Sequence, residues 1–137
     1  MKCLIDTNVI LDVLLKREPF YNDSASILTL SGQEDIILYV SASSIADIYY
    51  IAYQTLRNKE KVKQMLRKLL KIVLIAGVSG DEISNALALS WRDYEDSVQY
   101  SVALLQEMDG IVTRNPSDYK EAEIKVWRPE EFLLLQQ

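Results

Sequence analysis

A chain of 137 residues that is 49% hydrophobic and 26% charged has the size of one domain and enough apolar material for one core, so we expect a single domain over residues 1–137. Its net charge of −5 argues against broad electrostatic binding to nucleic acid unless basic residues gather on one face, and its single cysteine excludes an internal disulfide. Without a signal peptide or an apolar run of ~18 residues that could cross a bilayer, the sequence predicts a cytoplasmic protein with no membrane partner.

Short apolar runs alternate with longer segments of helical periodicity along the chain. The short runs predict strands at residues 3–5, 36–40, 72–75, 110–113 and 124–127. The longer segments predict helices at residues 9–16, 21–30, 45–56, 59–71, 82–90 and 94–108, with a short one after Pro129. This alternation predicts an α/β fold, a three-layer α/β/α sandwich around a central, mostly parallel five-stranded sheet.

Two of these helix starts have specific capping chemistry. Ser79, followed three residues later by Glu82, predicts a capping box, and Pro129 followed by two glutamates predicts a first helical turn. The chain has four glycines, none of them in a phosphate-binding loop, so a P-loop and a dinucleotide-binding fingerprint are both absent from the sequence.

Acidic and amide side chains follow three of the predicted strands. Asp6 comes directly after the first strand, Asp47 follows the second, and residues 113–118 follow the fourth and end at Asp118. Ligands of open α/β sheets bind at the carboxyl ends of the strands, so we expect these side chains to share one edge. The chain contains no histidine, so metal or acid–base chemistry must come mostly from carboxylates, which with amide and hydroxyl neighbours bind Mg²⁺ or Mn²⁺.

Capping alone can explain each acid taken singly. Asp6 can be the N-cap of the helix that follows it, although Thr7 or Asn8 can supply that cap instead. Asp47 can lie in the first turn of a helix that starts near Ser44.

The segment 93–96 has the same two explanations. Asp93 can cap a helix that has Asp96 at its third position, an arrangement that needs no function. Glu95 is rotated by about 100° from Asp96 on a helix, so we do not expect the two to share one metal ion. The four elements together, grouped at one edge, are harder to explain by capping.

These segments together resemble the PIN-domain family, which includes the VapC-like toxins of bacterial toxin–antitoxin pairs. Residues 5–9 (IDTNV) resemble its opening motif, residues 93–96 (DYED) its third-acid segment, and residues 111–119 (IVTRNPSDY) its closing motif. The resemblance covers nearly the whole chain and implies the family's PIN-like α/β/α sandwich.

The resemblance also implies a Mg²⁺- or Mn²⁺-dependent endoribonuclease that hydrolyses RNA phosphodiester bonds. On this basis the catalytic residues would be Asp6, Asp47, Asp96, Asn115 and Asp118. The metal would be bound by Asp6, Asp96 and Asp118, and the RNA substrate would be contacted by Thr7, Asn8 and Arg114. The partners implied are a small antitoxin protein and, as a further option, a second copy in a homodimer.

The sequence departs from the family pattern at two positions. The family's second acid is usually Glu, whereas Asp47 stands here, and its fourth is often Asp, whereas Asn115 stands here with Asp118 three residues on. Both departures weaken a ligand, so one alternative is a catalytically weakened PIN-fold module that binds RNA or protein. A haloacid-dehalogenase-like phosphatase is a second alternative, but it needs an acid where Asn8 stands.

Basic and aromatic residues form two further patterns at helical spacing. RNA contact and a solvated face explain the basic stripe equally well; its members are Lys59, Lys63, Arg67 and Lys71. Core packing or an association surface explains the aromatic group better than base stacking does; its members are Tyr49, Tyr50 and Tyr53.

Overall fold

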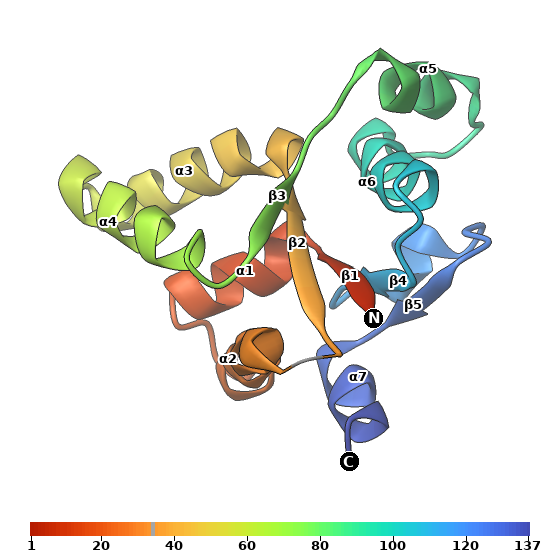
Figure 1. Ribbon diagram of the computed structural model, residues 1–137. Helices are drawn as coiled ribbons and strands as arrows, with labels where there is room; N and C mark the ends of the chain where they lie inside the picture. The colour runs from red at the N-terminus through yellow and green to blue at the C-terminus, as the bar shows by residue number, and fades with distance from the viewer. Residues whose placement is uncertain (34) are drawn as a thin grey trace.

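The computed structural model describes residues 1–33 and 35–137, and within them a five-stranded sheet forms the centre of the molecule (Figure 1). Its strand order is β3-β2-β1-β4-β5, and every pairing is parallel. The strands are β1 (Lys2–Ile5), β2 (Ile37–Ser41), β3 (Leu74–Ala76), β4 (Gly110–Val112) and β5 (Lys125–Trp127). The α/β prediction with a parallel five-stranded sheet is confirmed.

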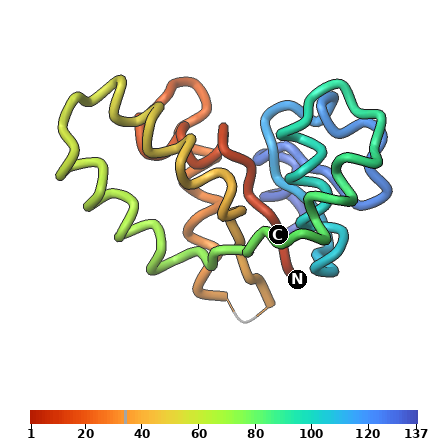
Figure 2. The backbone as a smooth tube through the Cα atoms, turned by 90° about the horizontal axis from the view of Figure 1, so that it is seen from above, coloured from red at the N-terminus to blue at the C-terminus, as the bar shows by residue number. Residues whose placement is uncertain are grey.

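Helices cover both faces of this sheet. They are α1 (Thr7–Leu14), α2 (Tyr21–Thr29), α3 (Ala42–Leu56), α4 (Lys59–Leu69), α5 (Gly80–Ala88), α6 (Tyr94–Leu105) and α7 (Pro129–Leu135). Two short 3-10 helices, η1 (Leu30–Gly32) and η2 (Pro116–Tyr119), complete the described elements. In the view from above, α1 to α4 lie on one side of the sheet and α5 and α6 on the other (Figure 2).

Strand β1 divides the apolar core into two halves. Its side chains alternate between the faces, so Cys3 and Ile5 pack with residues of α1, α2 and α7, while Leu4 packs with residues of α5 and α6. All three side chains are fully buried, as expected for the central strand of a parallel sheet. Among the described residues, no helix is both long and apolar enough to cross a membrane.

The sheet register brings distant polar residues to one edge. Ile5 pairs with Val112, and the amide of Asp6 donates to the carbonyl oxygen of Val112 at 2.9 Å. The residues that follow β1 and β4 are therefore neighbours, as the sequence predicts. Ser41, the last residue of β2, lies at the same carboxyl edge.

Three helix starts test the capping predictions. Helix α3 begins at Ala42, because Ser41 ends its strand and also caps the helix by accepting from the amide of Ser43 at 3.2 Å. The prediction that this helix starts near Ser44 is therefore wrong, and Asp47 lies beyond the first turn of α3.

At α5 the predicted capping box does not form, because the Ser79 hydroxyl donates to the Glu82 carboxylate instead of accepting from a backbone N–H. At α7 the first turn is confirmed, since the Glu131 carboxylate accepts from the Arg128 amide at 3.0 Å.

Gly110 supplies a packing test of this architecture. A Cβ at this position would lie 2.5 Å from both the Lys125 carbonyl oxygen and the Trp127 ring, so β4 and β5 can approach only with glycine there. We predict that Gly110→Ala lowers the free energy of unfolding by about 1–3 kcal/mol through overpacking. Gly80→Ala is the control, because a Cβ there meets nothing within 4 Å, and urea denaturation should show it unchanged or slightly stabilised. Equal stability of the two variants would contradict this account.

Candidate active site

Asp6 is the most constrained side chain at the carboxyl edge of the sheet. It is buried, with 7% of its surface exposed. Its carboxylate accepts four hydrogen bonds, from the Thr7 amide at 2.7 Å, Thr113 Oγ1 at 2.8 Å, Gln99 Nε2 at 3.1 Å and Tyr119 Oη at 3.3 Å. These donors come from α1, the segment after β4, α6 and η2.

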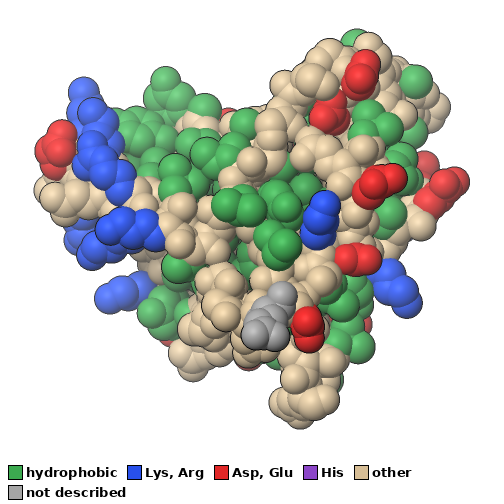
Figure 3. Space-filling view, viewed as in Figure 1, with side chains coloured by type: hydrophobic (Ala, Val, Ile, Leu, Met, Phe, Trp, Pro, Cys, Tyr) green, Lys and Arg blue, Asp and Glu red, His purple; other side chains and the backbone are tan. Residues whose placement is uncertain are grey.

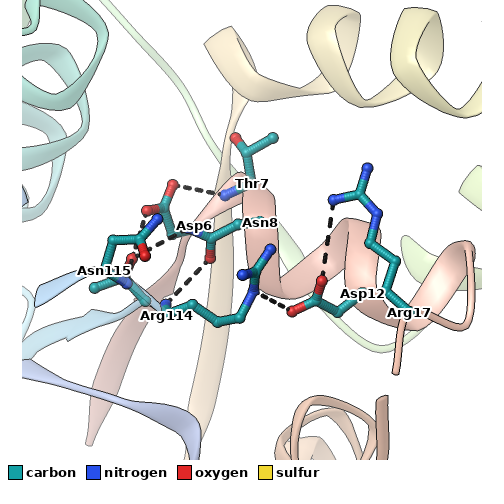
Figure 4. A network of polar contacts seen from close by, with 8 residues as sticks. Asp6, Thr7, Asn8, Asp12, Arg17, Arg114 and Asn115 are labelled. Atoms are coloured by element: carbon teal, nitrogen blue, oxygen red, sulfur yellow. Dashed lines mark hydrogen bonds and ion pairs between the residues drawn. The ribbon is translucent and has the colours of Figure 1, made fainter. Parts of the chain in front are cut away.

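Asp6 is therefore also the N-cap of α1. The expectation that Thr7 or Asn8 can take over the cap is wrong, because α1 begins at Thr7 itself and the Asn8 side chain is engaged elsewhere. Asn8 Oδ1 accepts from the Arg114 amide at 3.2 Å, and Asn8 Nδ2 lies 3.4 Å from Thr113 Oγ1. Asn8 thus fastens the segment after β4 to the start of α1 (Figure 4).

Asp96 faces Asp6 from the start of α6. The Asp93 carboxylate caps this helix by accepting from the Asp96 amide at 3.1 Å, as predicted. The Tyr119 hydroxyl lies between the two site acids, 3.3 Å from Asp6 Oδ2 and 3.4 Å from Asp96 Oδ1. One phenol proton can satisfy only one of these carboxylates at a time.

Burial and neighbouring carboxylates disfavour the charged form of Asp96. Burial is the larger cause, followed by the negative charges of Asp93, Asp6 and Asp118, and together they raise the pKa of Asp96 from 3.8 to about 7. Burial and the two site acids also raise the pKa of Tyr119, so this hydroxyl stays protonated. A cation placed between the acids would relieve this repulsion, so the donor set is suited to one.

The acids line a hollow of about 740 Å³, which falls in the size range of ligand pockets. Residues of α1, α3, α5 and α6 contribute to its wall. Five acidic side chains line it: Asp6, Asp47, Glu95, Asp96 and Asp118. Within residues 1–33 and 35–137, no three acids stand close enough to bind one ion together. Mg²⁺ commonly binds through one or two carboxylates, completed by water and substrate phosphate, so the residues fit that ion.

Glu95 is a site residue that the sequence reasoning missed. It lines the same hollow as Asp96 although the two side chains leave the helix in different directions. Across the hollow stands Asp47, whose charge is the largest of the causes that raise the pKa of Glu95. Glu95 and Asp96 do point in different directions, as expected of adjacent residues on a helix. Both nevertheless line the hollow, at different parts of its wall.

Six of the predicted site residues line the hollow and two do not. The six are Asp6, Thr7, Asn8, Asp47, Asp96 and Asp118. Arg114 instead places its Nε 2.6 Å from Asp12 Oδ2 and its guanidinium 4.0 Å from the centre of the Phe20 ring. The Asn115 residue is exposed, and its backbone amide donates to Thr113 Oγ1 at 3.1 Å. Arg114 and Asn115 are thus not among the residues that line the hollow.

The basic stripe and the tyrosines of α3 lie apart from the acids. Lysine and arginine side chains gather over α4 (Figure 3), and α4 contributes no lining residue to the hollow. The Tyr49 ring contacts both Tyr50 and Tyr53, at centroid distances of 5.7 and 6.3 Å, while Lys59 Nζ lies 5.9 Å from the centre of Tyr53. No tyrosine of this group lines the hollow.

Comparison with known proteins bears on this site. A family model described as PIN domain matches residues 2–117. VapBC2 from Rickettsia felis, bound to a DNA fragment from its promoter, has a TM-score of 0.70 at 18% identity and covers 93% of this chain and 99% of that one. DNA-bound VapBC from Salmonella typhimurium has a TM-score of 0.71 at 14% identity, covering 94% and 98%.

A more distant solved structure is VapC20 from Mycobacterium tuberculosis, a toxin that cleaves the Sarcin-Ricin loop. It has a TM-score of 0.62 at 11% identity, covering 80% of this chain and 86% of that one. At such identities these likenesses establish the fold. Comparison with curated proteins found none that matches the sequence.

The two facing acids should respond oppositely to neutralisation. Asp96→Asn removes the carboxyl whose pKa is raised, so it should stabilise the fold above pH 7, by on the order of 1 kcal/mol after solvent screening. Because the folded state binds this proton more tightly than the unfolded state, the gain should shrink as the pH falls through 7 toward 3.8. Asp6→Asn should instead lower the free energy of unfolding by about 1–3 kcal/mol both below and above pH 7. The NH2 group of the new asparagine would face the Gln99 and Thr113 donors, with which it cannot form a hydrogen bond.

Urea denaturation of both variants and the parent, at about pH 5 and about pH 9, measures these differences. Parallel behaviour of the two variants would show that the carboxylates are not held as described.

Proposed function

Because the chain belongs to the PIN-domain family, we propose that it is a divalent-metal-dependent endoribonuclease and the toxin of a toxin–antitoxin pair, acting in the cytoplasm. The observation that carries the proposal is the pairing of Asp6 and Asp96 around one tyrosine hydroxyl at the carboxyl edge of the sheet. The charge of Asp118 adds to their repulsion. Such crowding is unfavourable in the protein alone and becomes coordination when a cation binds.

Three acids would contribute differently to metal binding. Asp6 is fixed in one orientation by its four donors, so it offers a preset oxygen to Mg²⁺ or Mn²⁺. Asp96 is the acid whose protonation competes with the ion, and Asp118, at the rim, adds a negative charge that can reach the ion through water. The ion, when bound, supplies Lewis acidity at the phosphodiester and lowers the pKa of the attacking water.

The shape of the surface suits a substrate that passes the acids. A second hollow, lined by Arg92 and Lys120 among others, shares Asp96 and Asp118 with the first. A nucleic acid strand lying across these two carboxylates would continue into a hollow on either side. This continuity favours internal cleavage of a strand, the action of an endonuclease.

The position of Asn115 favours the enzyme over a catalytically weakened binding module. That alternative rested partly on the loss of an acid at position 115, but Asn115 is exposed and outside the hollow, whereas Asp118 lines it. The departure thus removes no charge from the wall. The phosphatase alternative is excluded by the family match.

The proposed partners follow from the neighbouring structures. The compared VapBC structures are complexes described as bound to DNA. We accordingly propose a small antitoxin as partner of this chain, with homodimerisation as a further proposal. RNA is proposed as the substrate on the precedent of the toxin that cleaves the Sarcin-Ricin loop.

Metal-dependent cleavage is the direct test. With single-stranded RNA and Mn²⁺ or Mg²⁺, the parent protein should cleave internally, and chelation of the metal should abolish the reaction. Asp96→Asn should lower kcat/KM by about 100-fold or more because one of the two facing ligands loses its charge. Asp23→Asn, which removes the same charge from the exposed side of α2, should cleave like the parent. Metal-independent cleavage or an active Asp96→Asn variant would refute the proposal.

The last acid of the closing motif should matter more than the amide before it. We predict that Asp118→Asn weakens Mn²⁺ binding and reduces cleavage by roughly 10-fold or more, since Asp118 lines both hollows. Asn115→Ser should change both by less than about 3-fold, as its side chain lies outside them. Calorimetric titration with Mn²⁺ and initial cleavage rates compare the two variants. A larger loss in Asn115→Ser than in Asp118→Asn would show that Asn115, and not Asp118, supports metal binding.

A further inference from the structure

The acidic hollow has one basic side chain in its wall. Of the described residues that line it, Arg17 is the only lysine or arginine, whereas five are acidic. The Arg17 side chain is 36% exposed, so a ligand in the hollow can reach it. Arg114, which the sequence suggested for substrate binding, is occupied by Asp12 and Phe20.

The end of α1 places Arg17 at this position. The Arg17 amide donates to the Asp12 carbonyl oxygen at 3.0 Å, and the Lys16 amide donates to the Val13 carbonyl oxygen at 3.3 Å. Lys16 has a φ of 51°, in the left-handed region. This pair of bonds is a Schellman motif, which reverses the chain at the helix end. The reversal returns Arg17 over the last turns of α1, beside the Asp12 side chain.

Asp12 is a buried carboxylate shared by two arginines. It is fully buried, and Figure 4 shows it between the guanidinium groups of Arg114 and Arg17. Arg114 is the close partner, with Nε 2.6 Å from Oδ2, whereas Arg17 Nη1 is 4.0 Å from Oδ1. Arg114 is therefore within hydrogen-bonding distance of Asp12, whereas Arg17, at 4.0 Å, interacts with it through charge alone.

The difference between these two distances leaves Arg17 free to bind a ligand. At 4.0 Å the Arg17 guanidinium is oriented by the Asp12 charge but donates no hydrogen bond to it. A guanidinium with free donors pairs with a phosphate through two parallel hydrogen bonds. It also offsets the repulsion that five carboxylates exert on an incoming polyanion.

We infer that Arg17 binds a backbone phosphate of the RNA beside the acids, and that the buried Asp12 is the positioning residue that aims it. This inference rests on the proposed ribonuclease function and names the residue that contacts its substrate. Arg114 has the complementary role of neutralising Asp12 and is not a substrate contact.

The first experiment separates binding from turnover. Steady-state cleavage of single-stranded RNA with Mn²⁺ should show KM raised about 10-fold in Arg17→Gln with kcat changed less than about 2-fold, since a phosphate contact outside the scissile bond acts on binding. Arg17→Lys should recover part of the lost affinity because it keeps the charge but not the paired donors. Lys16→Gln is the control, since it removes the same charge from the neighbouring exposed residue, which does not line the hollow.

The second experiment needs no catalysis. In the Asp96→Asn background, RNA affinity is measured against salt concentration, and adding Arg17→Gln should reduce the slope of log K against log salt by about 0.7, the value for one phosphate contact to a single strand. Lys16→Gln should leave the slope unchanged. Asp12→Asn should weaken RNA binding without changing the slope by as much, because Arg17 keeps its charge but loses its orientation.

The outcomes distinguish the inference from the function on which it rests. An unaltered KM and salt slope in a stably folded Arg17→Gln variant would overturn the inference while cleavage by the parent upholds the nuclease. RNA binding that depends on Arg17 in a parent protein that never cleaves would uphold the contact and refute the nuclease. Equal effects of Arg17→Gln and Lys16→Gln, or no RNA binding by the Asp96→Asn protein, would also overturn the inference.

Discussion

The rest of the site depends on the hydrogen bonds that the Asp6 carboxylate accepts. A charged group with 7% exposure is costly to bury unless donors replace the water it loses, and four donors do so here. Those donors come from four separate parts of the chain, so one side chain starts α1 and fixes the positions of α6, η2 and the segment after β4. The residue proposed to bind the metal is thus also the one that holds these elements together.

The arrangement of the elements was predictable because it depends on patterns of several residues. The five apolar runs become the five strands, and Cys3 to Ile5 are buried on both faces as a central strand requires. Helix starts depend on single hydrogen bonds and were less predictable. Ser41 is both the end of a strand and a cap, so α3 begins earlier than its hydrophobic pattern suggests. Asp6 similarly caps α1 although two neighbours had suitable side chains.

That Asp6 and the segment ending at Asp118 share one edge was predictable, because both follow neighbouring strands of a parallel sheet. Glu95 was missed, and the directions in which the other side chains point were not predictable. Arg114 lies in the closing motif, yet Asp12 and Phe20 draw its side chain away from the hollow, and both partners come from a distant part of the sequence. Arg17 reaches the hollow because a lysine adopts the left-handed conformation at the end of α1, where glycine is the usual signal. Tyr119, in η2, places its hydroxyl between Asp6 and Asp96, which are far from it in the sequence.

The sequence separation of the Asp6 contacts has a consequence for synthesis. Asp6 accepts from Gln99, Thr113 and Tyr119, which are 93, 107 and 113 positions later and so are made well after it. Contacts of such high order form late, after the intervening chain has closed a long loop. A nascent chain that ends before residue 99 therefore carries Asp6 with only the Thr7 amide of its four donors. The four hydrogen bonds to Asp6 can therefore all form only after the ribosome has made residue 119.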